Sequence, residues 1–459
     1  MKKGESYEGV VERVNFPNIG IVHLQETDVA VKNVIPGQRI RFRIRKKRKN
    51  YYEGILLEVL EKSSLQTEEV ACRNFPACGG CTYQTIPYEQ QLFLKEKQVQ
   101  DLLGKIPDLC EDYQFDGIYG SPRQWGYRNK MEFTFGDEYK DGPLSLGLHR
   151  KGGLYDVLTT DDCRIVPHDF TVILRRTLDY FRQNPQPYYR KMQREGYLRH
   201  LLIRRSQTTG RILVDLVTTS QAKPDLSGYV SSILSLEAEG QLEGNIAGIL
   251  HIVNDSPADV VQSDKTRILY GKDCIYEEIL GLKFKISSFS FFQTNTLGAQ
   301  VLYQIVRSYL GETKNKVVFD LYSGTGTIAQ VLAPAAKEVI GVEIVKEAVE
   351  DARENAAQNH LHNCTFIEGD VLKVVPSLDQ KPDLIVLDPP RDGVHPKVLP
   401  KILDFGAPKI VYISCKPTSL TRDLTEFFKR GYQLERVSCV DLFPETVHVE
   451  TCALLSLKE

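Results

Sequence analysis

Two side chains near the C-terminus are of the types that carry out covalent catalysis. Cys415 stands in Ser414-Cys415-Lys416-Pro417, directly after an apolar, strand-like run at residues 410–413. Glu450 follows later in the chain. A thiolate can attack a poor electrophile and hold it covalently, while a nearby carboxylate acts as the base. The pair predicts covalent catalysis by a thiol at the end of a strand.

A glycine-rich turn upstream has the form of a nucleoside-binding loop. An apolar run at residues 316–320 ends in Asp320, and Gly324 and Gly326 follow it. Glycines let the backbone approach a ligand closely and leave amides exposed at the start of a helix, expected here at 328–336.

Acidic residues follow the next expected strands. Because parallel strands end at one edge of a doubly wound sheet, these acids should gather around the glycine-rich turn, and the first should bind ribose hydroxyls. They are Glu343 after residues 338–342, Asp370 after 364–367 and Asp388 after 383–387.

The ligand of this edge is predicted to be S-adenosylmethionine rather than a dinucleotide. The turn reads Gly324-Thr325-Gly326-Thr327-Ile328-Ala329, without the third glycine of the dinucleotide motif and without a P-loop lysine. An acid at the strand end, Asp320, suits a cationic ligand better than a pyrophosphate.

The N-terminal segment, residues 1–62, reads as short strands broken by turns and predicts a small β-barrel. Residues 39–45 alternate arginine with apolar side chains, which is the two-residue period of a strand. The row could protect a sheet edge from aggregation. Four further basic residues follow directly, which favours binding to a phosphate backbone through Arg39, Arg41, Arg43 and Arg45.

The rest of the chain predicts two further domains in a multidomain α/β fold. Residues 63–284 form a mixed, strand-rich central domain with a helix at 87–103 that could pack on the catalytic part. Residues 285–459 alternate strands and helices, which is typical of a doubly wound, Rossmann-like sheet.

Four cysteines could hold a metal. Cys72, Cys78, Cys81 and the distant Cys163 supply four thiolates, and these fit zinc or an iron–sulfur cluster equally well. The remaining cysteines are expected in the core: Cys110, Cys274, Cys364, Cys439 and Cys452.

The composition says more about the cellular compartment of the protein than about its function. The net charge of −2 names no partner, and no run of the sequence has the length and apolarity of a signal peptide or a membrane span. Ten cysteines without a secretory signal are read as reduced thiols or ligands. The sequence predicts a cytoplasmic protein without a membrane partner.

Taken together, the motifs resemble those of bacterial RNA (uracil-5-)-methyltransferases. The series comprises Phe291-Phe292-Gln293-Thr294-Asn295, Asp320 to Gly324, Asp388-Pro389-Pro390-Arg391, Ser414 to Pro417 and Asp441 to Glu450. The N-terminal barrel resembles the TRAM module that members acting on ribosomal RNA carry and tRNA-specific members lack. One departure is Ser323, where many relatives have a second cysteine.

The resemblance implies a monomeric enzyme that methylates carbon 5 of uridine in 23S ribosomal RNA. It assigns the nucleophile to Cys415 and the base to Glu450, with Lys416 and the cationic cofactor as sources of positive potential for the thiol. It implies a [4Fe-4S] cluster, with zinc as the alternative, on the four cysteines. The other implied contacts are with cofactor for Gln293, Tyr322, Gly324, Thr327, Glu343, Asp370 and Asp388, with the flipped base for Gln293, Asp388 and Arg391, and with RNA for Arg128 and Lys130.

Three rival functions remain open at this stage. A methyltransferase for exocyclic amines also uses Asp-Pro-Pro, but it needs no thiol and usually has an aromatic residue where Arg391 stands. A tRNA uracil-5 methyltransferase shares the chemistry. A non-catalytic RNA-binding assembly factor is disfavoured because Cys415 and Glu450 are both present.

Overall fold

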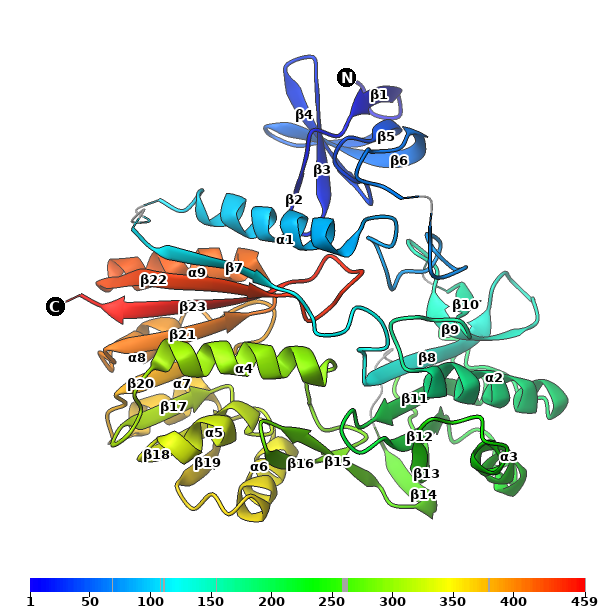
Figure 1. Ribbon diagram of the computed structural model, residues 1–459. Helices are drawn as coiled ribbons and strands as arrows, with labels where there is room; N and C mark the ends of the chain where they lie inside the picture. Colours follow the sequence, from blue (N-terminus) through cyan, green and yellow to red (C-terminus); the bar gives the residue numbers. More distant parts are fainter. Residues whose placement is uncertain are drawn as a thin grey trace.

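The computed structural model describes residues 1–458 except 68, 108, 110, 111, 154, 258–262 and 379, so Cys110 lies outside the described residues. Three large sheets and a two-stranded hairpin organise this part of the chain. Figure 1 shows the N-terminal sheet above a central sheet on one side and the C-terminal sheet on the other. None of the helices described here has the length and apolarity needed to cross a bilayer.

The N-terminal sheet has six strands in the order β1-β5-β6-β4-β3-β2. The predicted alternation in β5 is confirmed, because Ile40, Phe42 and Ile44 are buried in a core that this sheet forms. Closure of the sheet into a TRAM barrel stays a prediction. The strands are β1 (Ser6–Val10), β2 (Arg13–Asn15), β3 (Ile19–Leu24), β4 (Thr27–Lys32), β5 (Arg39–Lys47) and β6 (Tyr51–Glu61).

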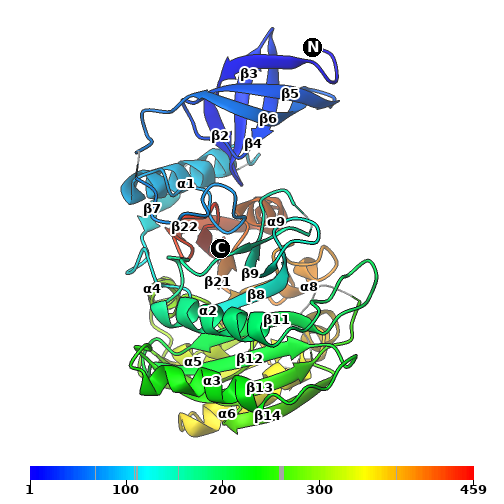
Figure 2. The same ribbon diagram turned by 90° about the vertical axis from the view of Figure 1, so that its right-hand side faces the viewer.

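The central sheet has seven strands in the order β10-β9-β8-β11-β12-β13-β14. Helices α2 (His168–Gln183) and α3 (Ser227–Ala238) cover one face of it, as Figure 2 shows, and bury Phe170 and Tyr229 against the strands. The strands are β8 (Lys130–Asp137), β9 (Leu144–His149), β10 (Val157–Thr159), β11 (Leu198–Arg205), β12 (Arg211–Thr218), β13 (Asn245–Val253) and β14 (Lys265–Gly271).

The C-terminal sheet confirms the predicted doubly wound fold. Its eight strands run β19-β18-β17-β20-β21-β23-β22-β7, and β19 to β21 are parallel. Successive side chains of a strand enter opposite faces, so Val318 packs in one core and Phe319 in the other. The strands are β7 (Gln114–Tyr119), β17 (Val317–Leu321), β18 (Glu338–Glu343), β19 (Cys364–Glu368), β20 (Leu384–Leu387), β21 (Lys409–Ser414), β22 (Tyr432–Val440) and β23 (Glu450–Leu457).

Helices cover both faces of this sheet. Residues of α4, α5 and α6 share one core with the hairpin β15–β16 and with part of the central sheet, which packs the two domains together. Residues of α7, α8 and α9 lie in the core of the other face. The elements are β15 (Cys274–Ile279), β16 (Leu282–Ser287), α4 (Thr296–Leu310), α5 (Thr327–Leu332), α6 (Lys346–Gln358), α7 (Val371–Val374), α8 (Leu399–Leu403) and α9 (Pro417–Lys429).

Two elements differ from the simplest expectation. The helix expected at 328–336 is shorter, because a 3-10 turn, Ala333–Ala335, with Pro334 within it replaces its last turn. Strand β7 belongs to the segment predicted as central, yet it pairs in parallel with β22 at the edge of the C-terminal sheet. Helix α1 (Tyr88–Leu103), confirmed near its predicted bounds, lies beside β7 (Figure 1).

Candidate active site

The glycine-rich turn after β17 is narrow and tightly held. Its backbone is left-handed at Tyr322 (φ 70°), Gly324 (φ 53°) and Gly326 (φ 72°). A Cβ atom at Gly326 would lie 2.6 Å from the ring of Phe366, so no larger residue fits there without movement. The amides of Tyr322 and Ser323 both donate to the carbonyl oxygen of Val342, which ties the turn to β18.

The predicted cofactor acids stand around this turn. Glu343, at the end of β18, accepts a hydrogen bond from the amide of Gly324 at 3.0 Å. Asp370 caps α7 by accepting from the amide of Leu372 at 2.9 Å. Thr327 begins α5 directly after Gly326. The fold therefore brings together the strand ends that the sequence indicated.

Asp320 leaves one carboxylate oxygen for a cation. Its Oδ2 accepts from the amide of Ala329 at 2.9 Å, while its buried Oδ1 has no partner among the described residues. Burial raises the pKa of this carboxyl to about 7, and nearby Asp388 and Glu343 act in the same direction. A buried, underpartnered acid beside an amide-lined turn fits a nucleoside that carries a positive charge.

Cys415 and Glu450 are brought opposite each other by strand pairing. Strand β21 pairs antiparallel with β23, and the last pair of their register is Ser414 with Thr451. Cys415 directly follows Ser414 and Glu450 directly precedes Thr451, so the two residues lie near each other where β21 ends. The charge of Glu450 raises the pKa of the Cys415 thiol.

The Cys415 thiol is half-buried and faces more negative than positive charge. Burial raises its pKa to about 11, Glu450 and Asp388 add to this, and Arg391 opposes it both by its charge and by a hydrogen bond to the sulfur. Arg391 therefore supplies the positive potential that was predicted for Lys416. The Lys416 ammonium instead pairs with the exposed Asp392, at 3.3 Å.

Burial raises the pKa values of two acids at this edge, Glu450 and Asp388. Burial raises the pKa of Glu450 to about 8; Asp388 raises it further and Arg391 lowers it. Burial likewise raises the pKa of Asp388, after β20, to about 7. Groups with such shifted values can exchange protons near neutral pH.

Tyr303 is a site residue that sequence analysis missed. It lies on α4, is 3% exposed, and stands close enough to Asp388, Asp320 and Glu450 for their charges to raise its pKa further above the value set by burial. Its hydroxyl shares a hydrogen bond with the side chain of Gln293. In the sequence Tyr303 reads only as an apolar position of a helix, so no signal marked it.

Comparison with known proteins agrees with this geometry. Residues 258–458 match the family model described as tRNA (uracil-5-)-methyltransferase. A protein of Clostridium tetani, described as an uncharacterized RNA methyltransferase, is 50% identical over 459 residues, covering 100% of this chain and 99% of that protein. The chain belongs to the RNA (uracil-5-)-methyltransferase family. It is an S-adenosylmethionine-dependent RNA methyltransferase.

Two further relatives extend the comparison. An RNA methyltransferase of Bacillus cereus, also described as uncharacterized, is 34% identical over 462 residues and covers 100% of this chain and 98% of that protein. The crystal structure of the Pyrococcus abyssi tRNA (uracil-54, C5)-methyltransferase with S-adenosyl-L-homocysteine superposes with a TM-score of 0.76 at 26% identity. It covers 98% of the methyltransferase described here and 100% of the archaeal chain.

In this methyltransferase, the segment 441–449 that leads into Glu450 is fixed by distant residues. The Lys95 ammonium, on α1, donates to the Asp441 carboxylate at 2.7 Å, and the two side chains are 1% and 0% exposed. Gln91 bonds both the side chain and the amide of Glu445. The amides of Thr82 and Tyr83 donate to the Glu445 carbonyl oxygen.

The four predicted metal-binding cysteines line one small cavity. Burial raises the pKa of the Cys81 and Cys163 thiols to about 12, and that of Cys72 and Cys78 in the same direction. The amide of Gly80 points to the Cys78 sulfur at 3.4 Å. Among the described residues no group of three or more Cys, His, Asp or Glu side chains forms a ready single-ion site. Four buried thiols around one cavity, with an amide that donates to one sulfur, fit a metal ion or cluster that is bound through cysteine sulfur.

The predicted RNA-contacting residues are dispersed. In β5, Arg39 pairs with Glu8 and Glu61, and Arg41 with Glu8 and Glu58, so phosphate groups would compete with these acids, while Arg43 and Arg45 are exposed. Arg128 donates to the carbonyl oxygen of Lys130. Burial and nearby Arg204 lower the pKa of Lys130 to about 8.

Loss of the buried Lys95–Asp441 pair should loosen the segment 441–449. Lys95→Met leaves the Asp441 carboxylate buried without its cation, which costs about 3–5 kcal/mol. We expect hydrogen exchange of residues 441–449 to become faster. The control Lys97→Met removes an exposed pair with Asp101 on the same helix and should change little. Equal exchange in the two variants would show that the buried pair does not hold the segment.

Proposed function

We propose that this enzyme methylates carbon 5 of uridine in 23S ribosomal RNA through a covalent bond between the Cys415 sulfur and the uracil ring. The observation that carries the proposal is the β21–β23 register, which sets the thiol opposite a buried carboxyl at the cofactor edge. A methyltransferase acting on an exocyclic amine has no use for this thiol.

Each residue has a role that its surroundings support. The Cys415 thiolate adds to carbon 6 of uracil, and the electron pair of the double bond moves so that carbon 5 becomes nucleophilic. S-adenosylmethionine supplies the methyl group that carbon 5 takes. Glu450 then accepts the proton of carbon 5, and the bond between sulfur and carbon 6 breaks to release the product and regenerate the thiolate.

Other residues prepare these steps. Arg391 donates to the Cys415 sulfur and stabilises its thiolate form. Asp388 and Gln293 would hold the edge of a uracil flipped out of its stack, and the Tyr303 hydroxyl lies beside the side chain of Gln293. On the cofactor side, Glu343 takes the ribose hydroxyls, Asp370 the adenine amine, and Tyr322, Gly324 and Thr327 line the nucleoside.

The N-terminal six-stranded sheet supports RNA binding but does not separate ribosomal RNA from tRNA, because a tRNA methyltransferase structure matches 98% of this chain. Its strand β5 presents exposed Arg43 and Arg45 on the face opposite the buried Ile44. Such a row suits binding to a phosphate backbone, and the proposal of ribosomal RNA rests on the resemblance of the motif series and of this segment to bacterial ribosomal-RNA members of the family. The related archaeal structure is named for a tRNA substrate, so tRNA is the alternative.

The four cysteines Cys72, Cys78, Cys81 and Cys163 would hold a [4Fe-4S] cluster, with zinc as the alternative. Such a cluster would stabilise the connector that contacts the segment 441–449, because Thr82 and Tyr83 follow Cys81 directly. We propose a cytoplasmic monomer with this cluster as a structural group.

RNA that contains 5-fluorouridine should form a stable adduct with the enzyme. Fluorine cannot leave carbon 5 as a proton does, so the bond to Cys415 should persist. We expect a shifted band in a denaturing gel with substituted 23S RNA and S-adenosylmethionine. The band should be absent in Cys415→Ala, which should still bind cofactor, and retained in the control Cys274→Ala. An adduct with tRNA alone would replace the ribosomal assignment, and turnover by Cys415→Ala would refute the covalent mechanism.

The proton-removal step should become faster as pH rises. Because the pKa of Glu450 is raised to about 8, its basic form is a minority at pH 7 and dominates only above the raised value. Release of tritium from carbon 5-labelled RNA in a single turnover should therefore increase between about pH 6.5 and 9. Glu450→Gln should instead accumulate the methylated adduct. A rate that falls over this range would contradict the role of Glu450.

Anaerobically purified enzyme should be brown and contain iron and sulfide. Cys81→Ser should lose the visible absorbance, because it removes one of the four buried sulfurs, whereas Cys274→Ser, in β15, should keep it. Metal analysis that finds zinc and no iron would overturn the cluster assignment.

A further inference from the structure

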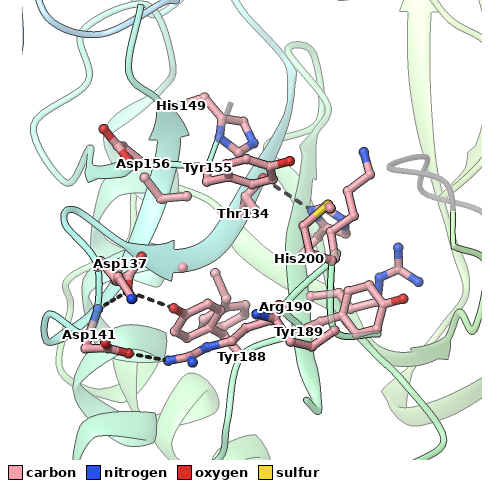
Figure 3. Close-up of a pocket in the computed structure, with 18 residues that line it drawn as sticks. Thr134, Asp137, Asp141, His149, Tyr155, Asp156, Tyr188, Tyr189, Arg190 and His200 are labelled. Atoms are coloured by element: carbon pink, nitrogen blue, oxygen red, sulfur yellow. Dashed lines mark hydrogen bonds and ion pairs between the residues drawn. The ribbon is translucent and has the colours of Figure 1, made fainter. Parts of the chain in front are cut away.

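A second cavity lies in the central domain, away from the cofactor edge. Its volume is about 400 Å³, within the range of small-ligand sites. Strands β8, β9, β10 and β11 and the segment 188–193 enclose it. Figure 3 shows Tyr155 on one side of the cavity and Tyr188 and Tyr189 on the other. The cavity therefore has aromatic rings on two sides.

The ring of Tyr188 is held in place before any ligand arrives. Its hydroxyl donates to the Asp137 carboxylate at 2.8 Å (Figure 3). The Arg190 guanidinium lies 5.3 Å from the ring centroid and is itself paired with Asp141 at 3.0 Å. A fixed ring loses little conformational freedom on binding, which favours stacking against a flat partner.

The ring of Tyr189 is held in a similar way. The Arg199 guanidinium lies 4.5 Å from its centroid and donates to the carbonyl oxygens of Asn254 and Ser256. Arg199 is only 3% exposed, so its position is set by the interior of the domain. By contrast, Tyr155 is 54% exposed and can accommodate an entering group.

Polar atoms in the cavity suit a neutral, hydrogen-bonding ligand. The Nδ1 atom of His149 is buried and has no hydrogen-bond partner among the described residues. Thr134 and His200 approach each other at 3.4 Å on the same wall. Charged side chains of both signs line the cavity, namely Asp137, Asp141 and Asp156 with Lys140, Arg190, Lys191 and Arg199. This balance favours a base over an isolated phosphate.

The cavity lies along the strands that lead to the active site. In the β8–β11 register, Lys130 pairs with Arg204 and Thr134 pairs with His200. Arg204 donates to the carbonyl oxygens of Ser288 and Ser290, just before Gln293. Arg204 and His200, which is on the cavity wall, are four residues apart in β11, a distance of about 13 Å. The cavity wall thus lies along β11 from Arg204, which holds the segment that leads to Gln293.

We propose that this cavity binds an unpaired nucleobase of the RNA substrate, a few nucleotides from the methylated uridine. The inference rests on the proposed function for the RNA but not on which RNA is methylated. Stacking between Tyr155 and the fixed Tyr188 and Tyr189 provides the affinity, and Thr134 and His200 on the cavity wall offer polar contacts to the edge of the base. The cavity would thus help to select the sequence around the target.

The test compares Tyr155→Ala with Tyr139→Ala, an exposed tyrosine of the same domain that does not line the cavity. With in vitro transcribed 23S RNA, Tyr155→Ala and Tyr188→Ala should raise KM about tenfold, the size of one lost stacking contact. The value of kcat should stay within about twofold, since Cys415 and Glu450 are untouched. Tyr139→Ala should match the unaltered enzyme.

Photo-cross-linking locates the contact independently of methyl transfer. Transcripts containing 5-iodopyrimidines, from both 23S RNA and tRNA, should cross-link to peptides with Tyr155 or Tyr188. An unchanged KM in both cavity variants would overturn the proposal, even with methylation intact. Cavity cross-links without methylation of any RNA would support the cavity and instead refute the proposed function.

Discussion

Burial of three carboxyl groups at one sheet edge is the constraint on which the site depends. Burial raises the pKa of Asp320, Asp388 and Glu450, and the charge of Asp388 raises the values of Asp320 and Glu450 further. A sulfonium cation at the same edge would lower all three pKa values. Cofactor and base are therefore linked electrostatically, and Arg391 is the chain's own cation near the thiol.

The second organising feature is the segment 441–449. It joins β22 to β23, and it contacts α1 through Lys95, the cysteine connector through Thr82 and Tyr83, and the central domain through the Tyr127 hydroxyl on the Pro444 carbonyl oxygen. Residues that take no part in the reaction thus hold the segment 441–449, at whose end Glu450 begins β23. This arrangement explains why the fold retains a buried ion pair at a place where apolar packing could serve.

Local patterns predicted the strands and the acids at their ends. Both the apolar runs and the acidic residues that follow them can be recognised within a few neighbouring residues. The Rossmann-like fold class was predicted from these local patterns. The proximity of Cys415 and Glu450 could not be predicted from them, because it depends on β23 running antiparallel beside β21. Lys95 and Asp441 are distant in sequence, so their pairing had no local signal. The effect of Arg391 on the Cys415 thiol was not predicted, because the two residues are far apart in sequence and come together only through the pairing of β20 with β21.

Strand β7 has a consequence for how the chain is made. It is synthesised long before its partner β22, and the two form one edge of the catalytic sheet. Until β22 has been synthesised, the backbone groups of β7 that bond to it lack their partner. Such long-range pairing is slow to form and leaves a strand available for wrong association. A ribosome-bound chain of this enzyme would therefore be a natural client for chaperones until β22 is available to pair with β7.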